Sequence, residues 1–467
     1  MYDNPNGEIP LSRFIGEPGF DRFDRDQDIA GWSAEYDLND AWTLRQNLRV
    51  QHIKTTMESV TSDMYSEDDP AEGGWDWRTI NRYANRGTGT ARALGVDTQS
   101  EWRIPVGQAR HTVLAGVDYY RSTFDARRET ADVGPAGSGG LFDLYAPVYG
   151  AAIGDFSLLS AVNSTSRQTG FYLQDQIEWG KWRLVGGLRH DRSVINGSSQ
   201  RGRGSAEDLG QRDSATTGRL GALYRFDAGW APYISYSTSF EPVGGATVDG
   251  TPFEPMRGKQ TEIGIKYQPN GAKWMATVAA FDLRQTNRLT DDPVYGFPDQ
   301  VQSGELRSRG IELEVTGRLS RNWSVIGSYA YLDTEVTSSE IPEELGKPAL
   351  YVPRHQASLW VDYTLTGQGA WAGTVLGLGV RHVGSSYGGD IEVAGGGYAS
   401  MNIPSHTVAD LRIATQLRRL APAFGDSELS LSVTNIADKR YVNGCGSLWT
   451  CGWGLGRQVS LTFSGRF

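Results

Sequence analysis

The chain ends in Val459-Ser460-Leu461-Thr462-Phe463-Ser464-Gly465-Arg466-Phe467, where apolar residues alternate with polar ones and an aromatic residue comes last. Successive side chains of a β-strand point to opposite faces. The apolar side chains and Phe467 therefore share one face, and the hydroxyl side chains and Arg466 share the other. One face suits lipid and the other water, but the edge of a soluble sheet has the same pattern, so this stretch alone leaves both interpretations open.

The composition narrows the classes of protein. The 467 residues contain no Pro/Ser-rich linker, which favours one large architecture. The mean hydropathy is -0.43, and no apolar run approaches the roughly 18 residues of a membrane helix. A transmembrane β-barrel remains compatible, because its lumen-facing residues are polar. The net charge of -10 argues against a nucleic-acid partner.

The alternation recurs along the chain. It is clear in 429–434, 376–381 and 234–240, and in 171–178, where Asp175 interrupts the apolar side. Such segments number roughly 17, and many have the 10 or so residues of a tilted membrane-spanning strand. The sequence therefore predicts an all-β protein.

The connections between these segments differ in length. Short turns at 39–40, 180–181, 227–229, 269–271 and 320–322 alternate with long polar segments near 59–91, 126–166, 195–212 and 241–258. Bacterial outer-membrane barrels place short turns on the periplasmic side and long loops outside. Trp42, Trp182, Trp230 and Trp323 lie beside short turns, where we expect them at the membrane interface; packing in a core is the alternative.

Two cysteines, Cys445 and Cys451, lie close together and are flanked by glycines. With no other Cys or His nearby to complete a metal site, a local disulfide is the favoured interpretation. Two free or buried thiols are the alternative.

The stretch Asn435-Ile436-Ala437-Asp438-Lys439-Arg440-Tyr441-Val442, the two cysteines and the aromatic end resemble the C-terminus of TonB-dependent siderophore receptors, most closely of the ferrichrome or ferric-hydroxamate branch. Further segments resemble these receptors in the same order, at 43–49, 115–118, 172–176, 237–242, 259–264, 307–314 and 352–355.

The resemblance implies a transmembrane antiparallel β-barrel of about 22 strands around a plug domain. Residues 1–467 would be the C-terminal portion of that barrel, incomplete with about 17 of 22 strands and without the plug. Residues 1–23 would then lie in an extracellular loop. An unclosed barrel exposes two strand edges, so we expect a fragment. Phe467 would be the end that the barrel-assembly machinery recognises.

The implied function is an outer-membrane receptor and energy-coupled transporter for ferric siderophores, of hydroxamate type such as ferrichrome. Its partners would be the ferric siderophore, the TonB complex through the missing N-terminal part, outer-membrane lipid, lipopolysaccharide and the assembly machinery. Because iron stays inside its chelator, we expect no protein metal site and no bound cofactor. The six histidines, at 52, 111, 190, 355, 382 and 406, show no zinc-like spacing.

The sequence differs from the ferrichrome receptor in the ligand-binding loops, where that receptor has aromatic contacts and this chain has Thr61, Asp63, Thr130 and Gly446. This difference favours hydroxamates in general over ferrichrome itself. Nearby aromatic residues are candidates for ligand contacts, with loop packing as the alternative: Tyr65, Trp75, Trp77, Phe142, Tyr145, Phe156 and Trp449.

The sequence contains no catalytic motif, so we expect no enzyme. The alternatives are a passive porin or adhesin and a barrel-embedded hydrolase, which needs a nucleophile and a base on adjacent strands, as with Ser385 and His382.

Overall fold

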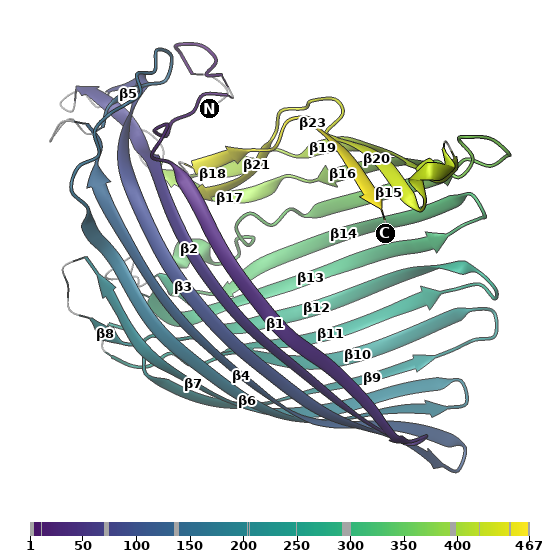
Figure 1. Cartoon of the computed structure of the whole chain (residues 1–467). Helices are drawn as coiled ribbons and strands as arrows, with labels where there is room; N and C mark the ends of the chain where they lie inside the picture. The colour runs from purple at the N-terminus through teal and green to yellow at the C-terminus, as the bar shows by residue number, and fades with distance from the viewer. Residues whose placement is uncertain are drawn as a thin grey trace.

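The computed structural model describes residues 4–10, 12–69, 74–134, 140–202, 204, 206–248, 250–291, 300–392, 398–419, 421–447 and 450–465. These residues form a curved, all-β wall (Figure 1). No helix among them is long and apolar enough to cross a bilayer.

Nineteen strands of the described chain form one main sheet, and seventeen remain when the two-residue strands β5 (Phe142–Asp143) and β8 (Glu207–Asp208) are set aside. The predicted all-β fold is confirmed. The long strands are β1 (Arg22–Asn39), β2 (Trp42–Asp69), β3 (Gly74–Val106), β4 (Ala109–Asp132), β6 (Ser157–Trp179), β7 (Trp182–Arg201), β9 (Gln211–Tyr224), β10 (Trp230–Glu241), β11 (Met256–Tyr267), β12 (Lys273–Asp291), β13 (Gln300–Arg318), β14 (Trp323–Ser338), β15 (His355–Thr364), β16 (Val375–Val383), β19 (His406–Gln416), β20 (Ser427–Thr434) and β23 (Gln458–Gly465).

Each long strand pairs antiparallel with the next long strand along the chain. Among the described residues β1 pairs only with β2, and β23 pairs only with β20. The wall is therefore open between β1 and β23 (Figure 1). Phe467 lies outside the described residues, so its predicted role in assembly stays a prediction.

The connections between the long strands contain smaller elements. Two hairpins stand apart from the main sheet, β17 (Ser386–Glu392) with β18 (Tyr398–Ile403), and β21 (Val442–Ser447) with β22 (Thr450–Trp453). Short 3-10 helices are η1 (Pro342–Glu344), η2 (Leu417–Arg419) and η3 (Pro422–Phe424).

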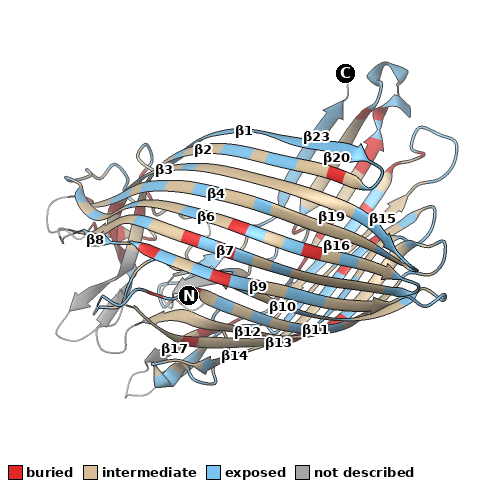
Figure 2. Cartoon of the chain, turned by 90° about the horizontal axis from the view of Figure 1, so that it is seen from below, coloured by how far each residue is buried: buried red, intermediate tan, exposed pale blue. Residues whose placement is uncertain are grey.

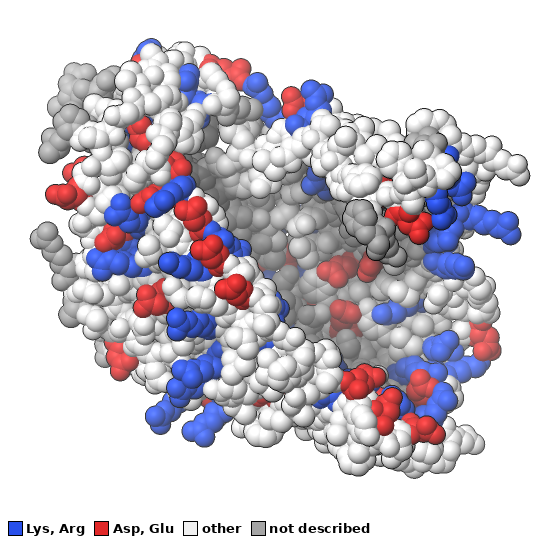
Figure 3. Space-filling model, in the orientation of Figure 1, with Lys and Arg blue, Asp and Glu red and all other residues white. Residues whose placement is uncertain are grey.

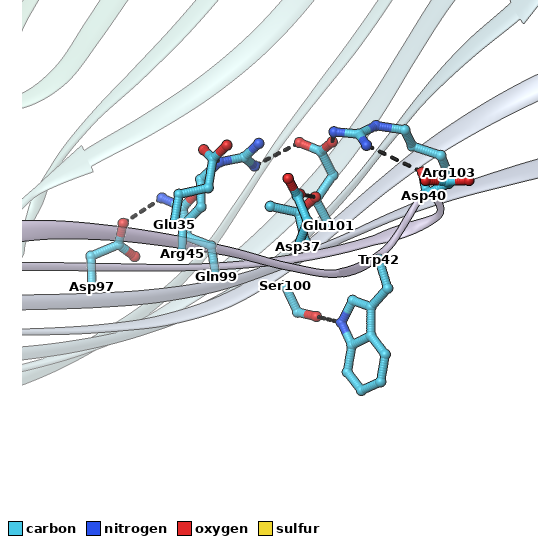
Figure 4. Close-up of polar contacts among 11 residues, drawn as sticks. Glu35, Asp37, Asp40, Trp42, Arg45, Asp97, Gln99, Ser100, Glu101 and Arg103 are labelled. Atoms are coloured by element: carbon cyan, nitrogen blue, oxygen red, sulfur yellow. Dashed lines mark hydrogen bonds and ion pairs between the residues drawn. The ribbon is translucent and has the colours of Figure 1, made fainter.

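The two faces of the wall differ in chemistry. Phe171, Leu173, Leu188, Leu220 and Ile263 are exposed on the convex face, which suits lipid. Figure 4 shows both faces near the first short turn: Arg45 lies between Glu35 and Glu101 on one side of the strands, and Trp42 points to the other side, where its indole Nε1 donates to Ser100 Oγ at 2.7 Å.

Aromatic residues gather beside the short turns, as predicted. Trp182, Trp230 and Trp323 are exposed, so packing in a core, the alternative for these tryptophans, does not apply. Their rings contact the neighbouring Tyr224, Tyr267 and Tyr363. An amphipathic ring in this position suits a membrane interface.

The predicted loops at 59–91 and 126–166 were placed wrongly. β2 and β3 remain paired from Trp42–Trp102 to Asp69–Gly74, and β4 extends to Asp132 before β6 begins at Ser157. Hydrophobic alternation ends where the strands leave the lipid, but the backbone hydrogen bonds of the ladder continue in water. Polar sequence therefore looked like loop although the strands persist.

Buried residues are sparse along the strands (Figure 2). Two hydrophobic clusters lie instead at the end of the wall that carries the long loops. One contains Val60, Ala84, Ala131 and Val133 with Phe156 against it, and the other contains Ile80, Phe142 and Leu144 with residues of the N-terminal segment against it. The hydrophobic clusters of the described residues thus lie where β2, β3 and β4 meet the long loops, and not at the centre of the sheet.

Candidate functional site

The second cluster belongs to a unit that we call the loop cap. It consists of the described residues of 4–21, residues 77–86 of β3, and residues 140–156. Ile9 and Ile15 of the first segment pack against Phe142 and Leu144 of the third. Three segments far apart in sequence therefore make one surface beyond the strand ends.

A buried ion pair holds the loop cap together. Arg82 Nη2 donates to Glu17 Oε1 at 2.8 Å, and the two side chains are 2% and 3% exposed. Arg82 Nη1 also donates to the carbonyl oxygens of Ile15 and Gly16 at 3.1 and 3.3 Å. The second carboxylate oxygen, Glu17 Oε2, accepts the Gly150 N–H at 2.8 Å. One arginine and one glutamate thus tie all three segments.

The predicted ligand contacts Phe142, Tyr145 and Trp77 meet in the loop cap. Phe142 is 2% exposed and lies 4.1 Å below the Arg82 guanidinium, so its ring packs inside the cap in this arrangement. Tyr145 is half-buried and its hydroxyl donates to the Gly7 carbonyl at 2.6 Å. Trp77 is 43% exposed. Two of the three rings therefore present surface to solvent.

Three further predicted contacts fall where side chains are not described. The backbones of Tyr65 and Trp75 lie on β2 and β3, which places them at the strand ends beside the loop cap. Trp449 lies outside the described residues. Phe156, the remaining aromatic candidate, packs against the first hydrophobic cluster and under Arg86 at 4.0 Å.

Asp143 and Arg78 form an ion pair on the surface of the loop cap that lowers the pKa of Asp143. Desolvation opposes ionisation of Asp143, but the backbone N–H groups of Ala146 and Tyr145 donate to its Oδ1 at 2.9 and 2.8 Å, and Arg78 Nε donates to its Oδ2 at 2.7 Å. These donors favour the carboxylate and hold the pKa of Asp143 below its ordinary value.

The concave face of the wall carries a second cluster of charges. Asp97 and Asp118 are direct cross-strand partners. Repulsion between their like charges makes this arrangement unfavourable. Arg189 offsets it by pairing with Asp118 and with the buried Asp191, and Tyr172 donates to Asp97 at 2.6 Å. Asp97, Asp118, Tyr172 and Arg189 line a hollow of about 630 Å³. Figure 3 shows charged side chains of both signs in the open concavity.

The two cysteines face each other across the β21–β22 hairpin, where Cys445 and Cys451 are register partners. The side chain of Cys445 is not described, and no free cysteine is present among the described residues. This register pairing places the two cysteines at neighbouring positions of the hairpin, as the predicted disulfide requires.

The hydrolase alternative finds no support in the geometry. His382 Nδ1 contacts Thr407 Oγ1 at 2.8 Å, and no hydrogen bond joins His382 to Ser385 in the described structure. Within the described ranges, no group of three or more His, Cys, Asp or Glu side chains is arranged to hold a metal ion.

Reasoning from the sequence missed Glu17, Arg82 and Arg189. Single charged residues in polar stretches have no periodic pattern that distinguishes them, whereas aromatic residues in loops stand out as ligand contacts. Arg82 and Glu17 are 65 positions apart, so only the packed loops bring them together.

An antiparallel wall with an apolar convex face, a charged concave face and short turns at one end is the wall of an outer-membrane β-barrel. Residues 2–436 match the family described as TonB dependent receptor-like, beta-barrel, and the chain belongs to that family. It is accordingly a protein of the outer membrane.

Similar proteins include receptors for iron chelates. The chain is 34% identical over 464 residues to the ferrioxamine B receptor of Salmonella typhimurium and 35% identical over 480 residues to the ferrichrome outer membrane transporter/phage receptor of Escherichia coli K12. Each alignment covers 99% of this chain and 61% of the relative, so the chain spans about three fifths of their length. These relatives are receptors and a transporter, not enzymes.

A solved structure with the same fold is the ferric-catecholate import receptor Fiu of E. coli K12 in its closed form. The TM-score is 0.80 at 22% sequence identity, with 99% of this chain and 67% of that chain covered. This likeness concerns the fold.

Proposed function

We propose that the protein takes part in the uptake of ferric siderophores, as the receptor wall that binds the chelate at the outer surface. The observation that carries the proposal is the loop cap. Trp77 and Tyr145 present ring surface there, over a framework fixed by the buried Arg82–Glu17 pair. Rigid aromatic side chains enclose a compact chelate with few rotamers to immobilise.

The substrate class that we favour is the ferric hydroxamates. Two relatives of this chain are named for ferrioxamine B and ferrichrome, and their identity to this chain exceeds the 25% of the catecholate receptor Fiu. Of the predicted contacts we propose that Tyr65, Trp75, Trp77, Tyr145 and Trp449 touch the chelate and that Phe142, which was predicted as a contact, supports the surface from below. The iron arrives inside its chelator as substrate, and no cofactor is part of the proposal.

Energy coupling is proposed through the TonB complex, by way of a plug and N-terminal part beyond residues 1–467. The family assignment supports this partner. The charged concave face, with its hollow beside Arg189, offers the polar surface that a lumen-filling domain needs.

Outer-membrane lipid and lipopolysaccharide are proposed partners on the convex face. A diagonal row of exposed arginines crosses β3, β4, β6, β7 and β9 just beyond the apolar belt, and Arg121 and Arg167 are direct cross-strand partners. No ion pair or hydrogen bond joins the side chains of the row to another described residue, which leaves the guanidinium groups available to lipid phosphates. Its members are Arg92, Arg121, Arg167, Arg192 and Arg212. The assembly machinery, acting on the end at Phe467, completes the proposed partners.

We further propose that Cys445 and Cys451 form a disulfide that closes the β21–β22 hairpin. Their register pairing supports it, and the outer surface of the cell is an oxidising compartment in which such a bridge persists.

Binding and conductance measurements test the proposal together. The receptor, produced from its native gene in outer membranes, should bind ferrioxamine B or ferrichrome saturably and take up labelled iron only when the membrane is energised. A ferric catecholate serves as the control ligand. Permanent conductance to small solutes without saturable binding would favour the porin alternative, and cell attachment without either would favour an adhesin.

A further inference from the structure

A polar pair lies on the lipid-facing side of β4 and β6. His111 Nδ1 and Asp175 Oδ2 are 2.7 Å apart, with side chains 24% and 33% exposed. Asp175 alternates with Leu173 and Ile177 on β6, and His111 is the register partner of Ile177. Asp175 is therefore the residue that interrupts the apolar side of this strand in the sequence.

The carboxylate of Asp175 has His111 as its side-chain hydrogen-bond partner among the described residues. Asp175 Oδ1 is buried and finds no hydrogen-bond partner among the described residues. Around the pair lie Ile104, Val113 and Ile177, which share its face. An ionisable side chain in the apolar part of a membrane is unfavourable unless it is paired, and such residues tend to be functional.

The opposite face of the same two strands carries a steric fit. Gly116 and Tyr172 are register partners, and a Cβ on Gly116 would collide with the Tyr172 ring. The ring is held there by its hydroxyl, which donates to Asp97. A shift of two residues in either direction would place Leu114 or Asp118 opposite Tyr172, and both have a Cβ.

Alternation of apolar and polar residues specifies the pairing of two strands only in part. A slip of one residue turns every side chain to the wrong face, but a slip of two residues returns each to its own face. In a tight hairpin the turn removes this ambiguity. β4 and β6 are joined instead by the long segment 133–156, so the register must be set by side chains.

We propose that His111–Asp175 on the lipid face and Tyr172–Gly116 on the lumen face form a register lock that selects one pairing of β4 with β6. A two-residue slip that pairs Ala115 with Asp175 moves His111 opposite Trp179 and leaves both ionisable groups unpaired in lipid. The opposite slip keeps His111 beside Asp175, and the Tyr172–Gly116 fit excludes it. The Tyr172–Gly116 fit therefore opposes both slips, and the His111–Asp175 pair adds a second penalty against the first of them.

Cysteine pairs on the lipid face report the register directly. Val117 and Phe171 are native partners, so V117C/F171C should cross-link in assembled receptor. V117C/L173C and V117C/T169C report the two slips, because diagonal positions lie about 7–8 Å apart in the native ladder, too far for a disulfide. Oxidation is carried out in outer membranes, and the cross-link is scored only in the folded, heat-modifiable band.

The lock variants are His111→Leu with Asp175→Leu, then the same pair with Tyr172→Ser. The first removes one of the two penalties against this slip and should raise the V117C/L173C cross-link about tenfold relative to the native pair. The second removes the Tyr172–Gly116 fit as well, so it should add the V117C/T169C cross-link and raise the V117C/L173C cross-link further. His111→Asn with Asp175→Asn keeps a hydrogen-bonded pair and should retain the native register. Val113→Leu with Ile177→Leu, which changes only the apolar neighbours, is the matched control and should also retain it.

The outcomes separate clearly. Native cross-linking alone in the triple variant would overturn the lock. Loss of the folded band in the Leu variant with its retention in the Asn variant would support the lock, because leucine is at least as compatible with lipid as asparagine. Slipped cross-links in the Val113/Ile177 control would assign register to general packing and overturn the proposal.

Discussion

Replacement of Arg82 by Met should open the loop cap while the wall of the barrel stays folded. The change removes the donors to Glu17 and to the carbonyl oxygens of Ile15 and Gly16, and it leaves the Glu17 carboxylate 3% exposed with only the Gly150 N–H as a partner. Breaking a buried ion pair in this way destabilises by about 3–5 kcal/mol. The local opening equilibrium should therefore rise more than about a hundredfold.

Hydrogen exchange measured by mass spectrometry checks this expectation. In R82M, peptides covering 12–21 and 140–156 should lose protection, and peptides from β11 to β13 should keep theirs. The double variant R82M/E17Q is the matched control, because it removes the uncompensated charge and should recover part of the loss. R82K keeps the charge but not the planar fork of donors, so it should be intermediate.

Two results would refute this reasoning. Unchanged protection of 12–21 and 140–156 in R82M would mean that the hydrophobic cluster around Phe142 holds the cap without the ion pair. Equal loss of protection in β11 to β13 would mean that the cap and the wall are one cooperative unit.

Three further predictions concern the outer loops. The pKa of Asp143 in the folded protein lies below its unfolded value of about 3.9. Its contacts therefore stabilise the loop cap above that pH, and this stabilisation is lost as the pH falls through the folded pKa. At pH values below about 4, hydrogen-exchange protection of 140–156 should decrease in the wild type but not in Asp143→Asn. Non-reduced peptide mapping should find Cys445 bridged to Cys451, C445S/C451S should weaken the hairpin by about 2 kcal/mol in proteolysis assays, and two free thiols would contradict the bridge. Desolvation and then Asp390 raise the pKa of Tyr387 to about 12. NMR titration of labelled tyrosine should show Asp390→Asn lowering this pKa, and an unchanged pKa would mean that Asp390 does not contribute to the shift.

Much of the wall was predictable because its information is local. Alternation over neighbouring residues sets which side chains face lipid, and the short turns beside Trp182, Trp230 and Trp323 set the hairpins. The number of long strands followed from counting such segments. The parts of β2 and β3 at the end of the wall with the long loops were missed. A polar strand in water has no alternation of hydrophobicity that would reveal it, although its backbone ladder is intact.

The candidate ligand surface was predictable only as a set of nearby aromatic residues. The sequence placed Phe142 and Tyr145 in one segment, but it gave no sign that Phe142 would be buried beneath Arg82 while Tyr145 stays half-exposed. Burial of a loop side chain depends on which other loops pack against it, and those loops come from distant parts of the chain.

By itself the sequence determined the faces, the strands and the short turns of a membrane wall, because these follow from a side-chain period of two and from local turn chemistry. The tertiary structure alone decided which charged groups meet. Asp175 appeared in the sequence as a flaw in an apolar strand, and it acquires its partner His111 only when β4 and β6 pair across a long loop. Glu17 likewise meets Arg82 only in the folded loop cap. The physical reason is that periodicity fixes orientation along one strand, whereas contact between strands and loops also requires a register and a closure that no local pattern encodes.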